Sequence, residues 1–440
     1  MSQGLAARRA ALGALAAVEE HGTWSNLAVP EAVAGLDQAR DRAFASHLAY
    51  DTLRWQGTLD WALGFHVRRP LGEVEPALRR VLRLGALQLL RTSVPDRAAV
   101  ATSVSLARES VPASRSTGAG GFVNGVLRSL ARERERLPWP DPEQDPEEHL
   151  ARTTAHPRWV VADLLERHSV ARTAAILEAD NASPGVTLRA TGDREALLEE
   201  LAGRGVDARP GALPSSVRAP GADPRRLAAV AEGRAVVQDE ASQQVGLAAG
   251  VRPGDRVLDL CAGPGGKTTH LAALAGPRGA VVAVELHPHR ARLIEQAAHR
   301  VGVAVDVRVG DALEAPLADD EAFDVVLLDA PCTGLGTGRR RPEIRWRVTP
   351  EQAVELGGLQ RRLLRVAGER VAPGGRLIYS VCTWTRAETH DVAEQFDRTR
   401  VAGGEEGWRA GERRQLLPDA DDTDGMFITA WIRDTVDRTA

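Results

Sequence analysis

Cysteine, lysine and long apolar runs are scarce in this sequence of 440 residues. The shortage of cysteines and apolar runs excludes several classes of protein. Three cysteines (Cys261, Cys332 and Cys382) exclude a disulfide framework and indicate a reducing compartment, so we expect a cytoplasmic protein. No apolar run approaches the roughly 18 residues of a membrane span, and no secretory signal is visible, so we expect no membrane contact. The cysteines and histidines lack metal-ligand spacing, which predicts no metal site.

Lysine is rarer still, because Lys267 is the single lysine against 55 arginines. Lys267 and the three cysteines fall in three short stretches of the second half, 261–267, 329–332 and 377–382. The single lysine therefore lies where a cofactor-binding loop is expected, and the cysteines lie where a nucleophile is expected. These stretches are where we look for chemistry.

Charge is distributed unevenly along the chain. The formal net charge is −4, yet residues 1–140 carry 18 basic and 13 acidic side chains, whereas residues 141–240 carry 12 and 18. A basic front end on a mildly acidic protein suits a module that targets a polyanion such as RNA. Charge alone does not separate this interpretation from an ordinary solvated surface.

The first part of the chain is predicted to be all-helical. Apolar residues recur near the helical period of 3.6 in five segments: 6–20, 38–53, 76–90, 98–110 and 121–136. Breakers separate these segments: Gly22, Pro30, Pro70, Pro95 and Pro112. A Pro- and acid-rich stretch, 137–149, follows and is typical of a linker. Residues 150–245 mix helical segments with short strands at 186–190 and 235–238, which predicts a small α+β domain.

From residue 246 onward, strands and helices alternate. Five short apolar runs are predicted strands: 256–260, 280–285, 304–309, 324–328 and 376–381. Helical stretches lie between most of them, at 268–275, 288–301 and 350–371. This alternation predicts a doubly wound, Rossmann-like parallel sheet. A final strand at 426–432 is expected to be antiparallel, at or near the sheet edge.

A glycine-rich turn, Cys261-Ala262-Gly263-Pro264-Gly265-Gly266-Lys267, follows the first of these strands. Three kinds of cofactor could bind such a turn. A phosphate-binding P-loop needs glycine at Cys261, and a dinucleotide fingerprint needs its third glycine at Thr268, so both patterns fail. S-adenosylmethionine remains, and it needs an acidic residue at the end of the second strand to bind the ribose hydroxyls.

Acidic residues stand where such a cofactor needs them. Glu285 ends the second strand and lies 22 residues after Gly263, near the roughly 20 expected. Asp311, after the third strand, is placed to meet the adenine. Each acid alone could equally be a solvated strand end; together with the turn they favour cofactor binding. The predicted cofactor-binding residues are Cys261, Ala262, Gly263, Pro264, Gly265, Gly266, Lys267, Glu285, Asp311 and Asp329.

Two cysteines follow neighbouring strands: Asp329-Ala330-Pro331-Cys332 comes after the fourth strand and Cys382 after the fifth. We expect the two thiols beside each other over the cofactor site. Such thiols suit methylation at C5 of a pyrimidine, because C5 becomes a nucleophile only after a thiolate adds at C6. The base must also leave its helix. Either cysteine alone could be a buried small hydrophobe; Cys261 is interpreted as structural, contributing its backbone.

An arginine-rich segment, 339–347, follows Cys332 closely and contains five arginines and Trp346. Arginine suits phosphate contacts and tryptophan suits base stacking. A solvated charge run is the alternative. The position next to Cys332 favours RNA contact.

At these residues the chain resembles the bacterial RNA (cytosine-C5)-methyltransferase family. The similarity covers 257–268, 329–334, 380–383 with Glu388, 237–243 and 424–427. The resemblance implies S-adenosylmethionine as cofactor, Cys382 as the nucleophile and Cys332 as an aid to product release. The chain departs from the family at Glu285, where Asp is commoner, and in the stretch after Cys382.

Residues 1–136 separately resemble the NusB-like fold, most clearly at 122–128. This fusion is similar to the enzymes that methylate 16S ribosomal RNA, and it implies a monomer with ribosomal RNA as its partner. The expected domains are a NusB-like helical RNA-binding domain (1–136), a linker (137–149), a small α+β domain (150–245) and a Rossmann-like methyltransferase domain (246–440). Two alternatives stay open, a transfer RNA substrate and a non-catalytic RNA-binding or antitermination factor.

Overall fold

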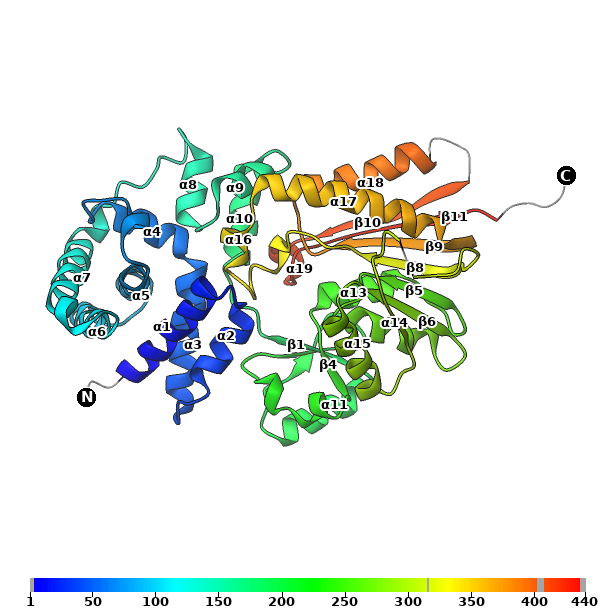
Figure 1. Ribbon diagram of the computed structural model, residues 1–440, viewed down its shortest axis with the longest axis horizontal. Helices are drawn as coiled ribbons and strands as arrows, with labels where there is room; N and C mark the ends of the chain where they lie inside the picture. The colour runs from blue at the N-terminus through cyan, green and yellow to red at the C-terminus, as the bar shows by residue number, and fades with distance from the viewer. Residues whose placement is uncertain (1–3, 315, 402–406, 436–440) are drawn as a thin grey trace. The chain divides into compact units, whose positions relative to one another are not determined.

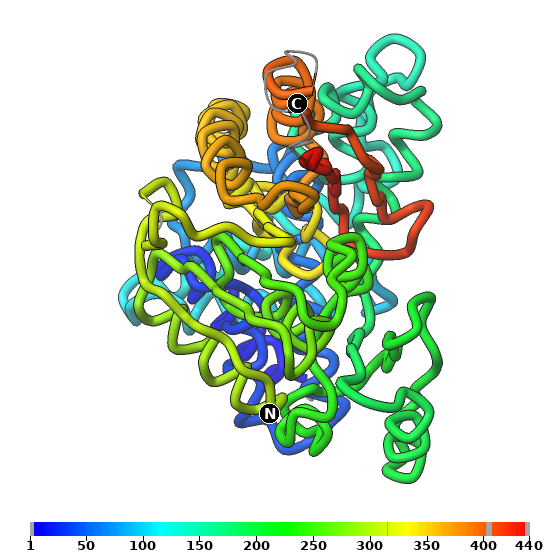
Figure 2. The backbone as a smooth tube through the Cα atoms, turned by 90° about the vertical axis from the view of Figure 1, so that its right-hand side faces the viewer, coloured from blue at the N-terminus to red at the C-terminus, as the bar shows by residue number. Residues whose placement is uncertain are grey.

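The computed structural model describes residues 4–314, 316–401 and 407–435 (Figure 1). The chain, which Figure 2 traces from blue to red, divides into two compact units. Unit 1 comprises Met1–Asn181 with Gly338–Arg347, and unit 2 comprises Ala182–Thr337 with Val348–Ala440. The division differs from the expected one at two places. The first helices after residue 150 fall in unit 1, and so does a ten-residue piece of the expected methyltransferase domain.

Unit 1 is helical throughout its described residues. Its α-helices are α1 (Leu5–Glu20), α2 (Ser25–Val33), α3 (Ala39–Arg54), α4 (Gln56–Gly64), α5 (Pro76–Arg91), α6 (Asp96–Glu109), α7 (Ala113–Glu133), α8 (Pro146–Thr153), α9 (Arg158–Leu165), α10 (Val170–Asp180) and α16 (Ile344–Arg347). Helix α5 packs against α1, α3, α4, α6 and α7, and Leu82, Leu84 and Leu87 are fully buried in it. The all-helical prediction for the N-terminal region is confirmed.

Two of these helices, α2 and α4, were not expected from the sequence. Pro30 was predicted to break the chain but lies inside α2. Proline removes one backbone hydrogen bond from a helix interior. Here Ala28, Val29 and Val33 are buried in the core of unit 1, and that burial offsets the missing bond.

The stretch that was expected to be a linker is part of unit 1 and packs on its helices. Leu137 is buried, and the ring of Trp139 lies 4.4 Å from that of Trp61 on α4, centroid to centroid. The stretch also ends earlier than expected, because α8 begins at Pro146 with the Asp145 side chain as its N-cap. Proline at the first helical position lacks only an N–H that would have no partner there, so it starts a helix well.

Unit 2 contains two sheets. The smaller has the strand order β2-β3-β1-β4, from β1 (Val186–Ala190), β2 (Arg209–Pro210), β3 (Ser216–Ala219) and β4 (Ala235–Val237). The larger has the order β10-β11-β9-β8-β5-β6-β7. Its strands are β5 (Arg256–Leu260), β6 (Ala280–Glu285), β7 (Asp306–Val309), β8 (Phe323–Asp329), β9 (Val371–Val381), β10 (Trp408–Leu416) and β11 (Met426–Arg433).

Helices cover both faces of the larger sheet. Successive side chains of a strand point to opposite faces, so strands that are apolar throughout need cover on both. Leu258 and Leu260 of β5 share a core cluster with α17 (Pro350–Glu369) and α18 (His390–Phe396). Val257 packs on the opposite face with α13 (Glu240–Ala248) and α14 (Gly266–Ala275). The two layers are visible in Figure 1. Helix α15 (Pro288–Val301) packs on β6 through Ile294 and Ala283.

Strands β7, β6, β5, β8 and β9 are mutually parallel, which confirms the predicted Rossmann-like sheet. The strand order reverses between β5 and β8, and ligands of such sheets bind at that switch point. Strand β11 is antiparallel to β9 and lies next to the edge strand, both as expected. The unexpected edge strand β10 is largely charged and exposed, so its sequence lacks an apolar pattern. No helix of the described residues is long and apolar enough to cross a membrane.

Candidate active site

The glycine-rich turn connects β5 to α14 at the switch point. Gly265 has φ +99°, and a Cβ there would lie 3.0 Å from the backbone of Ile294 on α15. Glycine is therefore required both for the conformation and for the close approach. The Gly265 N–H donates to the Ala262 carbonyl at 2.9 Å, which tightens the turn before α14 begins.

Glu285 is placed against this turn, as predicted from its position at the end of β6. Its Oε2 accepts a hydrogen bond from the Gly263 N–H at 3.0 Å, and its Oε1 accepts one from the His287 N–H at 2.9 Å. The side chain is 4% exposed. A Cβ on Gly263 would lie 2.3 Å from Glu285 Oε2, so only glycine at this position leaves room for the carboxylate.

Asp311 lies at the same end of the sheet but is not held by the turn. It is exposed, and its Oδ1 accepts a local hydrogen bond from the Leu313 N–H at 2.9 Å. Its charge contributes to the high pKa of Cys261, which places it near the turn. Asp311 therefore remains a predicted cofactor residue with no direct contact to the others.

Lys267 pairs with Asp329, the last residue of β8. Nζ donates to Asp329 Oδ2 at 2.8 Å, and Ser380 Oγ on β9 donates to Asp329 Oδ1 at 2.7 Å. Burial by itself would lower the pKa of Lys267, but the Asp329 carboxylate outweighs burial and raises it. The single lysine is thus a fixed cation that joins the turn after β5 to the ends of β8 and β9.

Asp259, on β5, is a site residue that the sequence analysis missed. It is fully buried, and its Oδ2 accepts from Thr268 Oγ1 at 2.6 Å. Its Oδ1 is buried without a hydrogen-bond partner among the described residues. Burial raises the pKa of Asp259 to about 7, and the Asp329 and Glu285 charges add to the rise. A charged residue inside an otherwise apolar strand was the signal that could have revealed it.

The Cys332 and Cys382 sulfur atoms are 3.4 Å apart. This is hydrogen-bond distance, well beyond the ~2.0 Å of a disulfide. The contact arises because β8 and β9 are parallel neighbours in which Asp329 pairs with Ser380. The interaction with Cys382, together with burial, raises the pKa of Cys332 well above its usual range. Cys332 is therefore a neutral thiol that can donate to Cys382.

Glu388 connects the loops that carry the two thiols. It is fully buried and accepts from the Thr333 N–H at 2.7 Å, from Thr333 Oγ1 at 2.6 Å and from Thr385 Oγ1 at 2.7 Å. Burial raises the pKa of Glu388 although these hydrogen bonds oppose the rise. Tyr379 OH donates to the Glu388 carbonyl at 2.6 Å, and Gln360 Oε1 lies 3.0 Å from the same hydroxyl. The thiol pair thus stands on a buried polar framework.

Cys261 does not join the thiol pair. Burial, together with the neighbouring carboxylates of Asp259 and Asp329, raises its pKa to about 12. Such a thiol stays protonated, so it is a poor nucleophile. Among the described residues, no group of three or more His, Cys, Asp or Glu side chains could hold a metal ion.

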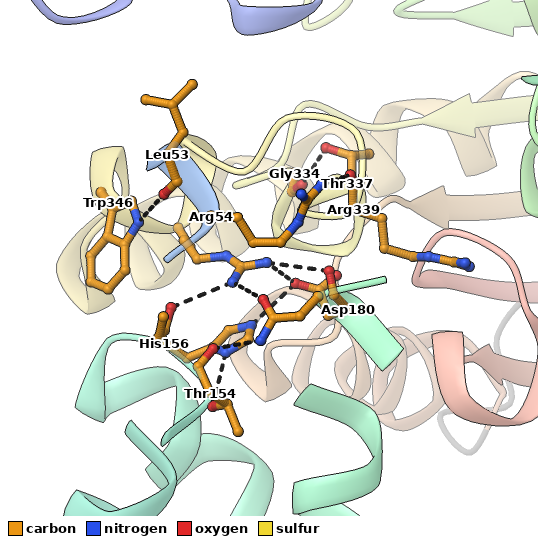
Figure 3. A network of polar contacts seen from close by, with 12 residues as sticks. Leu53, Arg54, Thr154, His156, Asp180, Gly334, Thr337, Arg339 and Trp346 are labelled. Carbon is orange, nitrogen blue, oxygen red and sulfur yellow. Dashed lines mark hydrogen bonds and ion pairs between the residues drawn. The ribbon is translucent and has the colours of Figure 1, made fainter. Parts of the chain in front are cut away.

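The arginine-rich segment after Cys332 is built into unit 1. Arg345 is 1% exposed and donates to Asp180 Oδ2 at 2.5 Å and to Asn181 Oδ1 at 2.7 Å. His156 Nε2 lies 3.1 Å from the same Asp180 oxygen (Figure 3). Burial, and after it the charge of Arg345, lower the pKa of His156 to about 4, so the network combines a neutral imidazole with an ion pair.

The neighbours of Arg345 also have partners inside unit 1. Trp346 Nε1 donates to the Leu53 carbonyl at 3.1 Å (Figure 3), and Arg347 donates to the Val18 carbonyl at 2.8 Å. The prediction of RNA contact is therefore wrong for Arg345, whose guanidinium is enclosed by protein. The run of arginines looked like a solvent-facing patch because the sequence does not show its buried carboxylate and carbonyl partners.

Comparison with known proteins identifies both parts of the chain. The NusB family profile matches residues 5–132, and the 16S rRNA methyltransferase RsmB/F profile matches residues 247–432. A Mycobacterium tuberculosis protein with a general methyltransferase name is 42% identical over 96% of both chains. Ribosomal RNA small subunit methyltransferase B of Xylella fastidiosa is 33% identical over 99% of both. The chain belongs to the RsmB/F methyltransferase family.

A solved structure supports the fold of this RsmB/F methyltransferase over its whole length. The crystal structure of PH0851 matches with a TM-score of 0.84 and 26% identity, covering 98% of this chain and 99% of that one. Family membership makes the protein an S-adenosylmethionine-dependent methyltransferase.

The turn at the end of β5 fits this cofactor. Glycine at position 263 keeps the space beside the Glu285 carboxylate open, since a Cβ would fill it. Each Glu285 oxygen accepts one backbone N–H, which leaves lone pairs to accept from ribose hydroxyls. The buried Asp259 Oδ1 is a further polar atom without a partner among the described residues.

Proposed function

We propose that this RsmB/F protein methylates C5 of a cytosine in 16S ribosomal RNA through a covalent bond between Cys382 and C6. The observation that carries the proposal is the 3.4 Å contact between Cys332 and Cys382 at the ends of two parallel strands. Relatives named ribosomal RNA small subunit methyltransferase B support the choice of RNA.

The cofactor would be held by the turn from Cys261 to Lys267, with Glu285 on the ribose, Asp311 toward the adenine and Asp329 between turn and thiols. When bound, S-adenosylmethionine supplies an electrophilic methyl group. The Lys267 ammonium is held by Asp329 and interacts electrostatically with Cys382. A fixed positive charge favours the thiolate form that Cys382 needs for attack.

The chain's own groups account for the remaining steps. The Cys382 thiolate forms a bond to C6, and the C5–C6 electron pair makes C5 nucleophilic. After C5 has gained its methyl group, its proton passes to a water molecule and the C5–H electron pair re-forms the C5–C6 double bond. The S–C6 bond breaks at the same time and its electron pair returns to Cys382, which restores the aromatic ring and the thiolate. The neutral Cys332 thiol donates a hydrogen bond to Cys382 and aids this breakdown. The assignment of the two roles follows the family resemblance, because both thiols are close enough to act.

The helical residues 1–136 are proposed to bind the RNA, and residues 246–440 to perform the chemistry. Residues 137–149 are proposed as a linker and 150–245 as a small α+β domain, in a protein that acts as a monomer. Ribosomal RNA from a strain lacking its small-subunit cytosine-C5 methylations is the substrate for the test. Purified protein and labelled S-adenosylmethionine should convert a cytidine to 5-methylcytidine, identified by nucleoside mass spectrometry. Label in a ribose, in uridine or in an exocyclic amine would contradict the proposal.

A further inference from the structure

A cluster of three aromatic rings, two of them exposed, lies on unit 1. Trp61 on α4 meets Phe65 edge to face at 5.2 Å and Trp139 in a tilted stack at 4.4 Å, centroid to centroid. Phe65 is 52% exposed and Trp139 is 43% exposed. These two are the only aromatic side chains among the strongly exposed large hydrophobic residues of the described chain.

Folding alone does not account for this exposure. The chain is only 4% aromatic, and its other described tryptophans are buried or partly buried. Trp61 and Phe65 are four residues apart, so they share one face of the helix and its end. Trp139 is tilted by 36° against Trp61 and keeps much of its own surface in solvent. The three rings together form an aromatic ledge.

A cavity of about 610 Å³ adjoins the ledge, and Trp139 is part of its wall. Trp55, Leu59, Arg91 and Leu137 also line it. The Arg91 guanidinium carbon lies 3.2 Å from the centre of the Trp55 ring. The cavity therefore contains a second indole covered by a cation, a combination that suits both a base and its phosphate.

Arginines lie on the cavity wall and shortly after Phe65 in the chain. Arg68 and Arg69 are exposed and form no hydrogen bond or ion pair with any described residue. Arg91 forms none either, although the charge of Asp51 acts on it. The cavity wall also contains Asp96, which pairs with Arg134 at 2.9 Å, and Glu135. Arg68, Arg69 and Arg91 are therefore the cations available to a polyanion.

We propose that this aromatic ledge (Trp61, Phe65 and Trp139) is a binding site for unpaired nucleotides of the RNA substrate. One base stacks on Trp139, its neighbour enters the cavity beside Trp55, and Arg91, Arg68 and Arg69 contact the phosphates. Single-stranded RNA is recognised in this way because its unstacked bases expose π-faces to aromatic side chains and arginine planes. The proposal rests on the proposed function and adds the site through which unit 1 holds RNA.

The test compares full-length variants for binding to short fluorescein-labelled oligoadenylate and oligouridylate, by anisotropy, with a duplex RNA as reference. Trp139→Ala should weaken single-strand binding on the order of tenfold, as expected for the loss of one base–aromatic stack. Trp139→Phe should retain most of the affinity, because a ring face is restored. Leu27→Ala is the matched control, since Leu27 is 59% exposed elsewhere on unit 1.

Salt dependence separates the arginines from the rings. Changing both Arg68 and Arg69 to Gln should flatten the dependence of affinity on salt, because fewer counterions are released. Trp139→Ala should lower affinity without changing that slope. Equal losses on single-stranded and duplex RNA would overturn the stacking site, because a duplex offers no free base.

The outcomes are distinguishable from those of the proposed function. If the wild-type protein forms 5-methylcytidine and Trp139→Ala binds single strands as the wild type does, the ledge is not an RNA site. If Trp139→Ala keeps its RNA affinity but loses binding to isolated small-subunit proteins, the ledge is a protein-docking surface and the proposal is wrong. If the wild type makes no 5-methylcytidine but Trp139→Ala still weakens single-strand binding, the ledge is supported as an RNA site and the proposed methylation is wrong.

Discussion

The sulfur atoms of Cys332 and Cys382 are 3.4 Å apart, although 50 positions separate the two residues in the sequence. Strands β8 and β9 run parallel and side by side, and each thiol follows the end of its strand. Glu388 holds both loops through Thr333 and Thr385. A pair of thiols in this arrangement can divide the formation and the breakdown of one covalent adduct.

The division of labour between the thiols is tested by single substitutions. We expect Cys382→Ala to lose methyl transfer and to form no covalent complex with RNA. Cys332→Ala should form a complex that survives denaturing electrophoresis, because addition at C6 proceeds while breakdown stalls. Cys261→Ala is the matched control for removal of a thiol, and it should form no such trapped complex. If Cys382→Ala accumulates the adduct and Cys332→Ala cannot form it, the assignment is reversed.

Glu285 is expected to dominate cofactor affinity. Glu285→Ala removes a buried carboxylate that also holds the Gly263 N–H, so S-adenosylmethionine should bind roughly tenfold or more weakly, on the scale of a charged hydrogen bond. Asp311→Ala removes an exposed acid from the neighbouring strand end and should have a smaller effect. Isothermal calorimetry measures both. An unchanged affinity in Glu285→Ala would remove that residue from the site.

The buried Asp259 predicts a pH dependence of stability. Its pKa is about 7 in the folded protein against roughly 4 when unfolded. Between those values the folded state retains a proton that the unfolded state has released, so the free energy of unfolding falls as pH rises. Asp259→Asn removes this titration, so its stability relative to wild type should increase from pH about 4 to about 7. Denaturant melts of the two proteins that stay parallel across this range would contradict the prediction.

The Arg345–Asp180 pair predicts a large loss of stability in unit 1. Arg345→Ala leaves a buried carboxylate without its cation, which should lower the free energy of unfolding of unit 1 by about 3–5 kcal/mol. Arg9→Ala is the control, because Arg9 pairs with Glu109 on the surface of unit 1 at 3.0 Å and such pairs contribute only ~0–1 kcal/mol. Urea unfolding of the wild type and both variants, followed by tryptophan fluorescence, gives both values. A loss no larger than that of Arg9→Ala would show that the pair is not needed.

Local patterns in the sequence determined most of the individual elements. The apolar residues identified the bounds of β5, β6 and α15 to the residue. They form a continuous run in a buried parallel strand but recur about every 3.6 residues in an amphipathic helix. The glycines of the turn indicated close approach to a ligand, and Glu285 was placed beside them by its position at the end of the second strand and its distance from Gly263. Strand β10 escaped prediction, since a solvated edge strand needs no apolar face.

Tertiary structure alone decided which residues of distant segments contact one another. The sequence could not show that Arg345 leaves the methyltransferase region to pair with Asp180, because a buried ion pair is a property of two segments rather than one. It could not show that Asp259 retains an unpartnered oxygen, or that Lys267 is held by Asp329. Each depends on which strands are neighbours and on how completely water is excluded. Burial and adjacency, which set pKa values and thiol distances, exist only once the chain has folded.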